Sequence, residues 1–373
     1  MVKKDNRLTT VIINKNARYV KTCKRGWPDA TAFPQSASYW YHLAMKLPQA
    51  LVLFILSTLA CISLYAQDEN PIRVDTSIVR LNVGVVDHKG RPITDLNRES
   101  FDLFEDGQKQ QITRFEPSTA PFSVVILLDM SGSTIGFRPV IKQSAFRFID
   151  ALAPEDRVAV VEFYDKINLR NDFTTDRHAI ANSIEVSNGR GKTQLYKALE
   201  FALDKLEKEK SRRKAIIVLT DGVDTLVQDK DRQLLEPLKD DQIATAIRPE
   251  ASDALNRVLN RSDAQGVTIY PLALPGGDPA KLADPTPRQI AMFTAARSRL
   301  QILADRTGGT LNAINRLEQM GRIYAEVAAD LRTLYTIEYQ PTNDKHDGKW
   351  RSIKLDVKNP DLIPRTRPGY FAR

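Results

Sequence analysis

The chain has 373 residues, of which 42% are apolar and 27% are charged, a composition typical of globular proteins. This length predicts one large or two modest domains with enough chain to bury a core. The net charge of +8 arises in residues 1–66, which hold nine Lys/Arg and two Asp/Glu and leave 45 basic and 44 acidic residues elsewhere. Nucleic-acid affinity needs concentrated positive charge, so the near-neutral remainder argues against a nucleic acid as partner.

Residues 1–66 have the pattern of a secretory leader. Lys46 precedes an apolar core at residues 51–62, and small residues follow up to Ala66. This order of charge, apolar core and small residues is typical of a signal peptide. The segment that begins at Met45 has the usual length and order of a signal peptide, which predicts that Met45 is the true start. We therefore expect an exported protein, periplasmic or secreted.

Two other interpretations of the leader stay open. An uncleaved signal anchor would hold the protein in the membrane, although the apolar run is shorter than the ~20 residues that a span needs. Cleavage before Cys61 would make a lipoprotein, although Thr58 to Ala60 fit that signal poorly. Both cysteines, Cys23 and Cys61, lie in the leader, so no disulfide or thiol chemistry is expected after it.

Residues 67–119 and 333–373 both show the alternation of β-strands. Val79, Leu81, Val83 and Val85 alternate with polar or small residues, and an Asp106-Gly107 turn indicates a hairpin. Near the C-terminus, Tyr335, Ile337 and Tyr339 alternate in the same way, as do Ile353, Leu355 and Val357. Because the two β-rich flanks enclose a different pattern, we expect them to pair into one small antiparallel β-sandwich.

Residues 120–332 alternate between strands and helices. This order predicts an α/β fold with a doubly wound, mostly parallel sheet, which is a Rossmann-like arrangement. The charged stretch 226–265 is longer than a crossover needs, and we expect a solvated insertion with one or two short surface helices. The expected strands are 124–128, 157–163, 215–219 and 267–272, and the expected helices are 140–152, 195–208, 290–305 and 317–331.

Three polar segments are expected to meet at the carboxyl edge of this sheet. Asp129, Ser131 and Ser133 follow the first buried strand, Thr193 opens a helix, and Asp221 follows another buried strand. Hydroxyl and carboxylate oxygens without His or Cys suit a hard cation, Mg²⁺ before Mn²⁺ or Ca²⁺. The serines and the threonine are the expected direct ligands. The two aspartates are expected to act largely through hydroxyls or waters.

These segments resemble the metal-ion-dependent adhesion site (MIDAS) of a von Willebrand factor type A (VWA) domain. The resemblance covers about residues 121–332 and rests on Asp129-x-Ser131-x-Ser133, Thr193 and Thr220-Asp221-Gly222. The flanks, with Gly90-Arg-Pro92 and Arg367-Pro-Gly369-Tyr370, resemble exported bacterial proteins that carry this domain. The resemblance implies protein binding or cell adhesion through an acidic residue of a partner, and no catalysis.

Several alternatives stay open. Each polar segment alone is compatible with turn or helix-cap residues, and the metal site of a structural assembly module could be vestigial. Gly191-Lys192-Thr193 ends like the phosphate-binding loop of a nucleotide hydrolase, but the full motif needs a glycine where Val186 stands. Hydrolytic catalysis is disfavoured because the histidines are scattered and Ser131 has no identifiable base.

Overall fold

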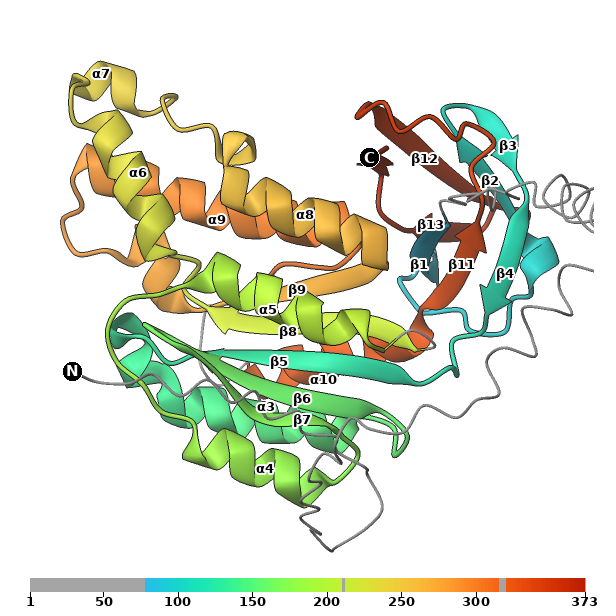
Figure 1. Cartoon of the computed structure of the whole chain (residues 1–373), viewed down its shortest axis with the longest axis horizontal. Helices are drawn as coiled ribbons and strands as arrows, with labels where there is room; N and C mark the ends of the chain where they lie inside the picture. Colours follow the sequence, from blue (N-terminus) through green and yellow to red (C-terminus); the bar gives the residue numbers. More distant parts are fainter. Residues whose placement is uncertain (1–77, 210–211, 315–319, 373) are drawn as a thin grey trace, which may run out of the picture. The chain divides into compact units, whose positions relative to one another are not determined.

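The core of the protein is a six-stranded sheet in the order β10-β9-β8-β5-β6-β7 (Figure 1). A computed structural model describes residues 78–209, 212–314 and 320–372. β5 and β8 are buried at every position, as strands of a parallel sheet covered on both faces should be. The strands of the six-stranded sheet are β5 (Phe122–Asp129), β6 (Arg157–Phe163), β7 (Ile167–Thr174), β8 (Arg213–Thr220), β9 (Val267–Ala273) and β10 (Asn312–Ala313).

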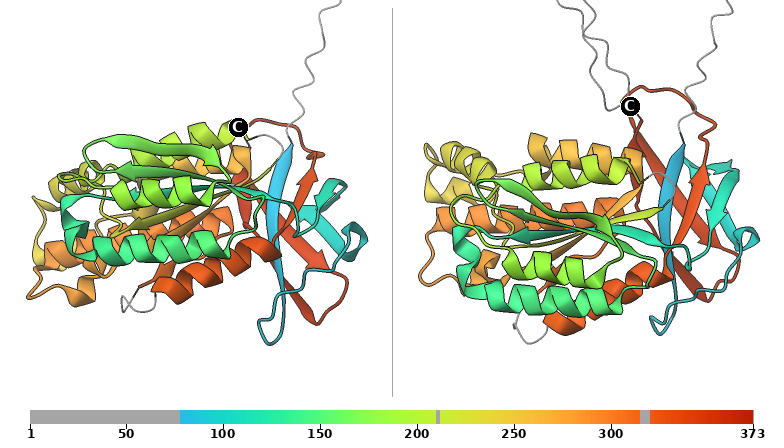
Figure 2. Two further views of the ribbon diagram at one scale, coloured as in Figure 1. Left: turned by 90° about the horizontal axis from the view of Figure 1, so that it is seen from below. Right: turned by 60° about the horizontal axis from the view of Figure 1, so that its bottom comes forward.

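Helices cover both faces of this sheet (Figures 1 and 2). Alternate side chains of β5, β6, β8 and β9 point into one of two apolar cores, one shared with α3, α4 and α10 and the other with α5, α8 and α9. The expected fold class, α/β with a mostly parallel sheet, is confirmed. The helices are α3 (Arg138–Ala151), α4 (Arg177–Val186), α5 (Leu195–Glu207), α8 (Asp253–Gln265), α9 (Pro287–Thr307) and α10 (Met320–Thr333).

The stretch 226–265 differs from the expected solvated insertion. It contains α6 (Thr225–Leu235), the single turn α7 (Asp240–Ile243) and α8. The expectation is wrong for α8, because Leu255, Val258 and Leu259 are buried in the core beneath α5 and α9. These residues follow the i, i+3, i+4 spacing of a buried helical face, so α8 is a crossover helix of the fold.

Strands from both flanks form two four-stranded antiparallel sheets. β1 pairs with β11, so that Leu81 lies opposite Ile337, and β12 pairs with β2. Both sheets contribute to one apolar core, which is the expected sandwich. The domain boundaries at residues 66, 119 and 332 stay a prediction. The strands are β1 (Val79–Asp87), β2 (Phe101–Glu105), β3 (Gln108–Gln110), β4 (Ile112–Glu116), β11 (Tyr335–Tyr339), β12 (Trp350–Val357), β13 (Leu362–Arg365) and β14 (Gly369–Phe371).

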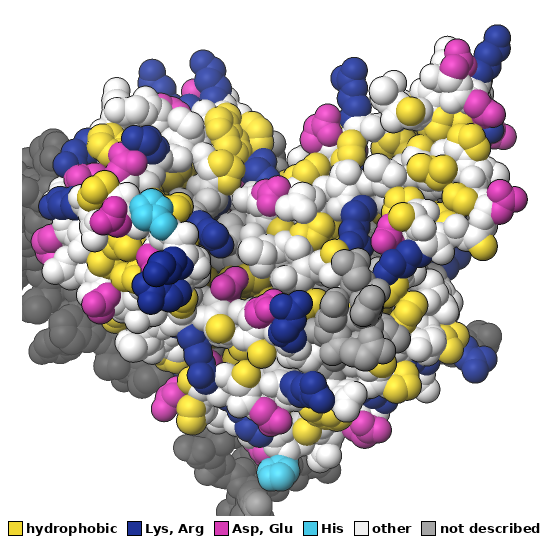
Figure 3. All heavy atoms as spheres, turned by 180° about the vertical axis from the view of Figure 1, so that it is seen from behind, with side chains coloured by type: hydrophobic (Ala, Val, Ile, Leu, Met, Phe, Trp, Pro, Cys, Tyr) yellow, Lys and Arg dark blue, Asp and Glu magenta, His cyan; other side chains and the backbone are white. Residues whose placement is uncertain are grey.

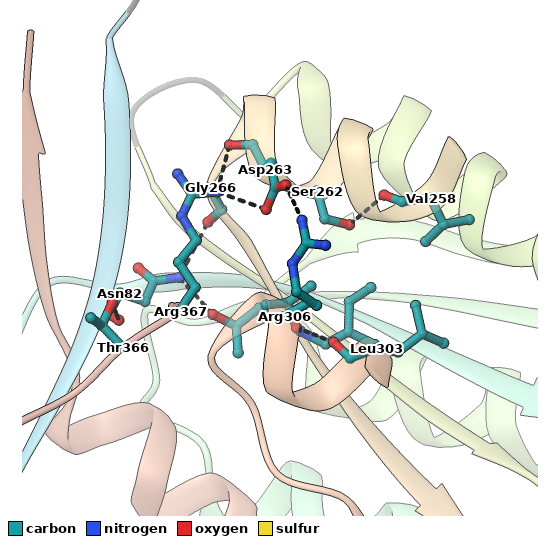
Figure 4. A network of polar contacts seen from close by, with 12 residues as sticks. Asn82, Val258, Ser262, Asp263, Gly266, Leu303, Arg306, Thr366 and Arg367 are labelled. Carbon is teal, nitrogen blue, oxygen red and sulfur yellow. Dashed lines mark hydrogen bonds and ion pairs between the residues drawn. The ribbon is translucent and has the colours of Figure 1, made fainter. Parts of the chain in front are cut away.

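Buried polar contacts link the sandwich to the α/β core (Figure 4). The side chain of Asn82 in β1 donates to the carbonyl of Gly266 (3.2 Å) and to the hydroxyl of Thr268 (2.8 Å). Arg367 donates from the C-terminal segment to Asp263 in α8 (3.0 Å). The described residues therefore form one compact unit.

The surface agrees with the near-neutral charge of the chain after residue 66. On the face in Figure 3, basic and acidic side chains are interspersed. Among the described residues, no helix has the length and apolar character needed to cross a membrane. The predicted leader, residues 1–66, lies outside the described residues.

Candidate functional site

The first and third polar segments meet at the carboxyl edge of the sheet. β5 and β8 are adjacent and parallel, with Leu128 opposite Leu219. Asp129 is therefore beside Thr220, and Asp221 follows directly. The Thr220 hydroxyl donates to Asp129 Oδ2 (2.7 Å), which links the two strand ends.

The loop after β5 is arranged around Asp129. The backbone N–H of Ser131 donates to Asp129 Oδ1 (3.0 Å), and the Thr134 hydroxyl donates to the Asp129 carbonyl (2.7 Å). The hydroxyl oxygens of Ser131 and Ser133 are 3.2 Å apart, and Ser133 donates to Asp221. Four of the five predicted site residues are therefore joined by polar contacts.

Thr193 reaches this site through its loop. The Gly132 N–H donates to the Gly191 carbonyl (3.1 Å), so the Thr193 loop lies against the Ser131 loop. Gly191 has a φ of +98°, and a Cβ there would overlap the Asp165 carboxylate, so this turn requires glycine. Thr193 itself is buried, with 6% of its surface exposed, and makes no direct hydrogen bond to the other four residues.

The N-terminus of α6 holds Thr193 in place. The Thr193 N–H donates to the Thr225 hydroxyl (2.9 Å), and the Thr225 N–H donates back to the Thr193 carbonyl (3.0 Å). Further along α6, Asp231 accepts two hydrogen bonds from Arg299 of α9, at 2.6 and 2.7 Å. The first turn of α6, at the start of the stretch 226–265, therefore supports the site structurally.

Two carboxylates are buried at the site without a cationic partner. Asp129 is fully buried and Asp221 is 3% exposed, and among the described residues neither forms an ion pair. Burial and the nearby charge of Asp221 raise the pKa of Asp129 to about 7, and burial also raises the pKa of Asp221. A bound cation would offset this unfavourable burial of negative charge.

The donor set fits a hard cation. No cluster of three or more His, Cys, Asp or Glu side chains occurs in the described part of the chain. The site instead combines two carboxylates with the hydroxyls of Ser131, Ser133 and Thr193. Such all-oxygen shells are the ones that Mg²⁺, Mn²⁺ and Ca²⁺ prefer.

Sequence reasoning missed Arg138, which fastens two loops of the site together. Its guanidinium donates to the carbonyls of Met130 (2.9 Å) and Gly189, and to the side chain of Asn188. Because these acceptors are mostly backbone oxygens, the sequence carries no signal for them. Thr225 was also missed, and Thr220 was named only as part of the Thr-Asp-Gly motif, without its hydrogen bond to Asp129.

A close backbone approach at Gly277 gives a first prediction. A Cβ at this position would overlap the carbonyl oxygen of Asp221, whereas a Cβ at neighbouring Gly276 would make only ordinary contacts, with the Phe137 ring at 3.4 Å and with the Asp221 Cβ at 3.9 Å. We expect Gly277→Ala to lower the free energy of unfolding by about 1–3 kcal/mol, as overpacking does, and to displace Asp221. Urea denaturation measures this effect. Gly276→Ala is the matched control, and an equal loss in both variants would contradict the prediction.

The fold and the polar carboxyl edge together define an α/β domain with a ligand site at its sheet edge. Residues 124–223 match the family model of the von Willebrand factor type A domain. The chain therefore contains a VWA domain, as the motifs predicted. Domains of this family typically mediate protein–protein interactions.

Solved structures with similarity to this chain include three bacterial proteins. The von Willebrand factor type A protein from Catenulispora acidiphila is 13% identical over 81% of this chain, with a TM-score of 0.43, and this chain covers 64% of that one. The vWF domain of the type V pili tip protein Mfa5 from Porphyromonas gingivalis is 15% identical (57% of this chain, 95% of that chain, TM-score 0.41). The pilus adhesin SpaC from Lactobacillus rhamnosus GG is 12% identical (78% and 47%, TM-score 0.42). No curated protein matches the chain.

Proposed function

We propose that this protein is an exported, non-enzymatic binding protein that holds a divalent cation and binds an acidic residue of a protein partner. Asp129, Ser131, Ser133, Thr193 and Asp221 would form the cation site, with Mg²⁺ preferred over Mn²⁺ or Ca²⁺. The observation that carries this proposal is the pair of buried carboxylates, which face hydroxyls and form no ion pair with any residue that the structure describes. Export rests on the leader pattern of residues 1–66.

The residues divide into two roles. Ser131, Ser133 and Thr193 would supply hydroxyl oxygens to the cation, while the carboxylates of Asp129 and Asp221 orient the serine loop by accepting its hydrogen bonds. When bound, the cation would supply an electrophilic centre for an outside oxygen. Gly132 and Ser133 are exposed, so the site is open to a partner on the side of this loop.

The main alternative, a nucleotide hydrolase, is disfavoured by the local fold. A phosphate-binding loop follows a buried strand. Here the loop before Thr193 follows helix α4, which ends at Val186. The Gly191 carbonyl accepts a hydrogen bond from Gly132 and faces the neighbouring loop.

The test of the cation site compares melting of the full chain with and without Mg²⁺ or Mn²⁺. A ligand present at 100 times its Kd stabilises the folded state by about 2.7 kcal/mol, so the parent protein should melt at a higher temperature with the cation. Asp129→Asn should abolish this response. Without cation it should melt no lower than the parent, because the amide removes the repulsion between two buried carboxylates.

Asp284→Asn is the matched control, since Asp284 is exposed in the loop after β9 and its φ of +46° suits asparagine. Its cation response should equal that of the parent. If neither cation changes the melting temperature of the parent protein, at concentrations up to the millimolar range usual for weak sites, the proposed function is excluded.

A further inference from the structure

Exposed apolar side chains occur in the elements that follow the carboxyl ends of three strands. Ile135 follows β5 in a 3-10 helix (Gly132–Phe137), Leu226 opens α6 after β8, and Ile290 lies in the first turn of α9 after β9. Their exposed fractions are 49%, 53% and 44%. Single exposed apolar residues are common, so these residues bear on function only where they adjoin the candidate site.

Ile135 and Leu226 lie beside residues of the proposed cation site. Ile135 is two residues after Ser133, and the intervening Thr134 is buried and bonded to the Asp129 carbonyl. The loop is thus held without the Ile135 side chain. Leu226 follows Thr225, which exchanges two hydrogen bonds with Thr193. Each apolar side chain therefore adjoins a different loop of the site.

The charges near these loops favour an acidic partner. Arg190 and Lys192 are exposed in the loop that lies against Gly132. Neither side chain forms an ion pair among the described residues. One carboxylate, that of Asp165, lies against the same loop, where it accepts the Lys192 backbone N–H at 2.7 Å. The two basic side chains outnumber this one carboxylate, and the excess positive charge would steer an acidic segment towards the site.

We propose that Ile135 and Leu226 form an apolar rim that selects partner segments in which the Asp or Glu has an apolar residue on each side. This inference rests on the proposed function, because the carboxylate of the segment would occupy the cation site. The rim adds a rule for the partner's sequence: apolar, acidic, apolar. Ile290 lies farther along the edge and is not needed for this recognition.

The experiment uses two synthetic fluorescent peptides, one centred on Leu-Asp-Leu and the other on Ser-Asp-Ser, with the full chain in Mg²⁺. Fluorescence anisotropy measures both dissociation constants. We expect the leucine peptide to bind about tenfold more tightly, because partial burial of two leucines supplies the difference. Ile135→Ser combined with Leu226→Ser should reduce this preference to less than about twofold, while the Mg²⁺ melting response stays that of the parent.

Ile363→Ser is the matched control, because Ile363 is 44% exposed on β13 of the sandwich. This variant should keep the preference. Equal, Mg²⁺-dependent binding of the two peptides to the parent protein would overturn the rim and leave carboxylate binding intact. A preference that survives the double substitution would overturn the assignment to Ile135 and Leu226. No Mg²⁺-dependent binding of either peptide would overturn the rim and the carboxylate-binding function together.

Discussion

Replacing Asp263 with asparagine is expected to lower the free energy of unfolding by about 3–5 kcal/mol, the usual loss when one partner of a buried ion pair is removed. Asp263 Oδ1 accepts from Arg367 and Oδ2 from Arg306, each at 3.0 Å (Figure 4). The side chains of Asp263 and Arg367 are each 6% exposed. An amide in place of the carboxylate leaves two guanidinium groups without a counter-charge in a largely dry contact.

Aromatic rings fix this network further. The Arg306 guanidinium lies over the Trp350 ring, 4.4 Å from its centroid, and 5.4 Å from the centroid of Phe371. Since Trp350 and Phe371 belong to the sandwich and Arg306 to α9, the network ties the C-terminal strands to the α/β core. Arg367 is also the first residue of the C-terminal motif Arg367-Pro-Gly369-Tyr370, and this contact gives that arginine a structural role.

Chemical denaturation in urea measures the effect of Asp263→Asn. The matched control is Asp305→Asn, because Asp305 is exposed on α9 and, in the described part of the chain, its carboxylate accepts only from Gln301, at 2.7 Å. We expect the control to change the free energy of unfolding by less than about 0.5 kcal/mol. A loss in Asp263→Asn no larger than that of the control would show that the network contributes little to stability.

The sequence predicted the buried strands well because their environment allows only apolar side chains. β5, β8 and β9 lie between two layers of helices, so they read as continuous apolar runs. β7 was missed because it is an antiparallel edge strand with mixed polar composition and only partial burial. Its pairing with β6 depends on a neighbour that its own sequence does not reveal.

Helix α8 shows how composition can conceal a periodic signal. Its segment is rich in charge, and this favoured a solvated insertion. The apolar positions Leu255, Val258 and Leu259 nevertheless follow helical spacing, and Ser262 and Asp263 continue the same buried face. A polar residue can be recognised as part of a buried helical face only when its hydrogen-bond or ion-pair partner is known. For Asp263 that partner is Arg367, 104 residues away.

The candidate site was partly predictable for a similar reason. Asp129 and Asp221 end or follow strands that the sequence identifies, so the parallel sheet alone brings them to one edge. Thr193 depends on loop contacts, and these run through the backbone of Gly132 and Gly191. Contacts to backbone atoms do not depend on which side chain a residue carries, so the sequence did not predict the role of Arg138.

Arg138→Met is expected to weaken cation binding by about 10- to 100-fold, the range found when residues that orient metal ligands are replaced. Arg138 touches none of the proposed ligand side-chain atoms and acts as a positioning residue. It donates to the Met130 carbonyl at 2.9 Å and to the Ser131 carbonyl at 3.3 Å, and it also binds the Gly189 carbonyl. Without it, the loop that carries Ser131 and the loop that carries Thr193 lose a shared anchor.

Calorimetric titration with Mn²⁺ separates this role from general stability. Lys142→Met is the matched control, because Lys142 lies one turn further along α3 and donates to the Glu185 carbonyl, near the same loop. The control removes one contact between α3 and a neighbouring backbone carbonyl, and that contact does not reach Ser131. If both variants lose Mn²⁺ affinity equally, the effect belongs to the packing of α3. The expected result is that only Arg138→Met loses Mn²⁺ affinity, while the two variants melt at similar temperatures without cation. This result would mean that the two loops must be held together for the five site residues to bind a cation.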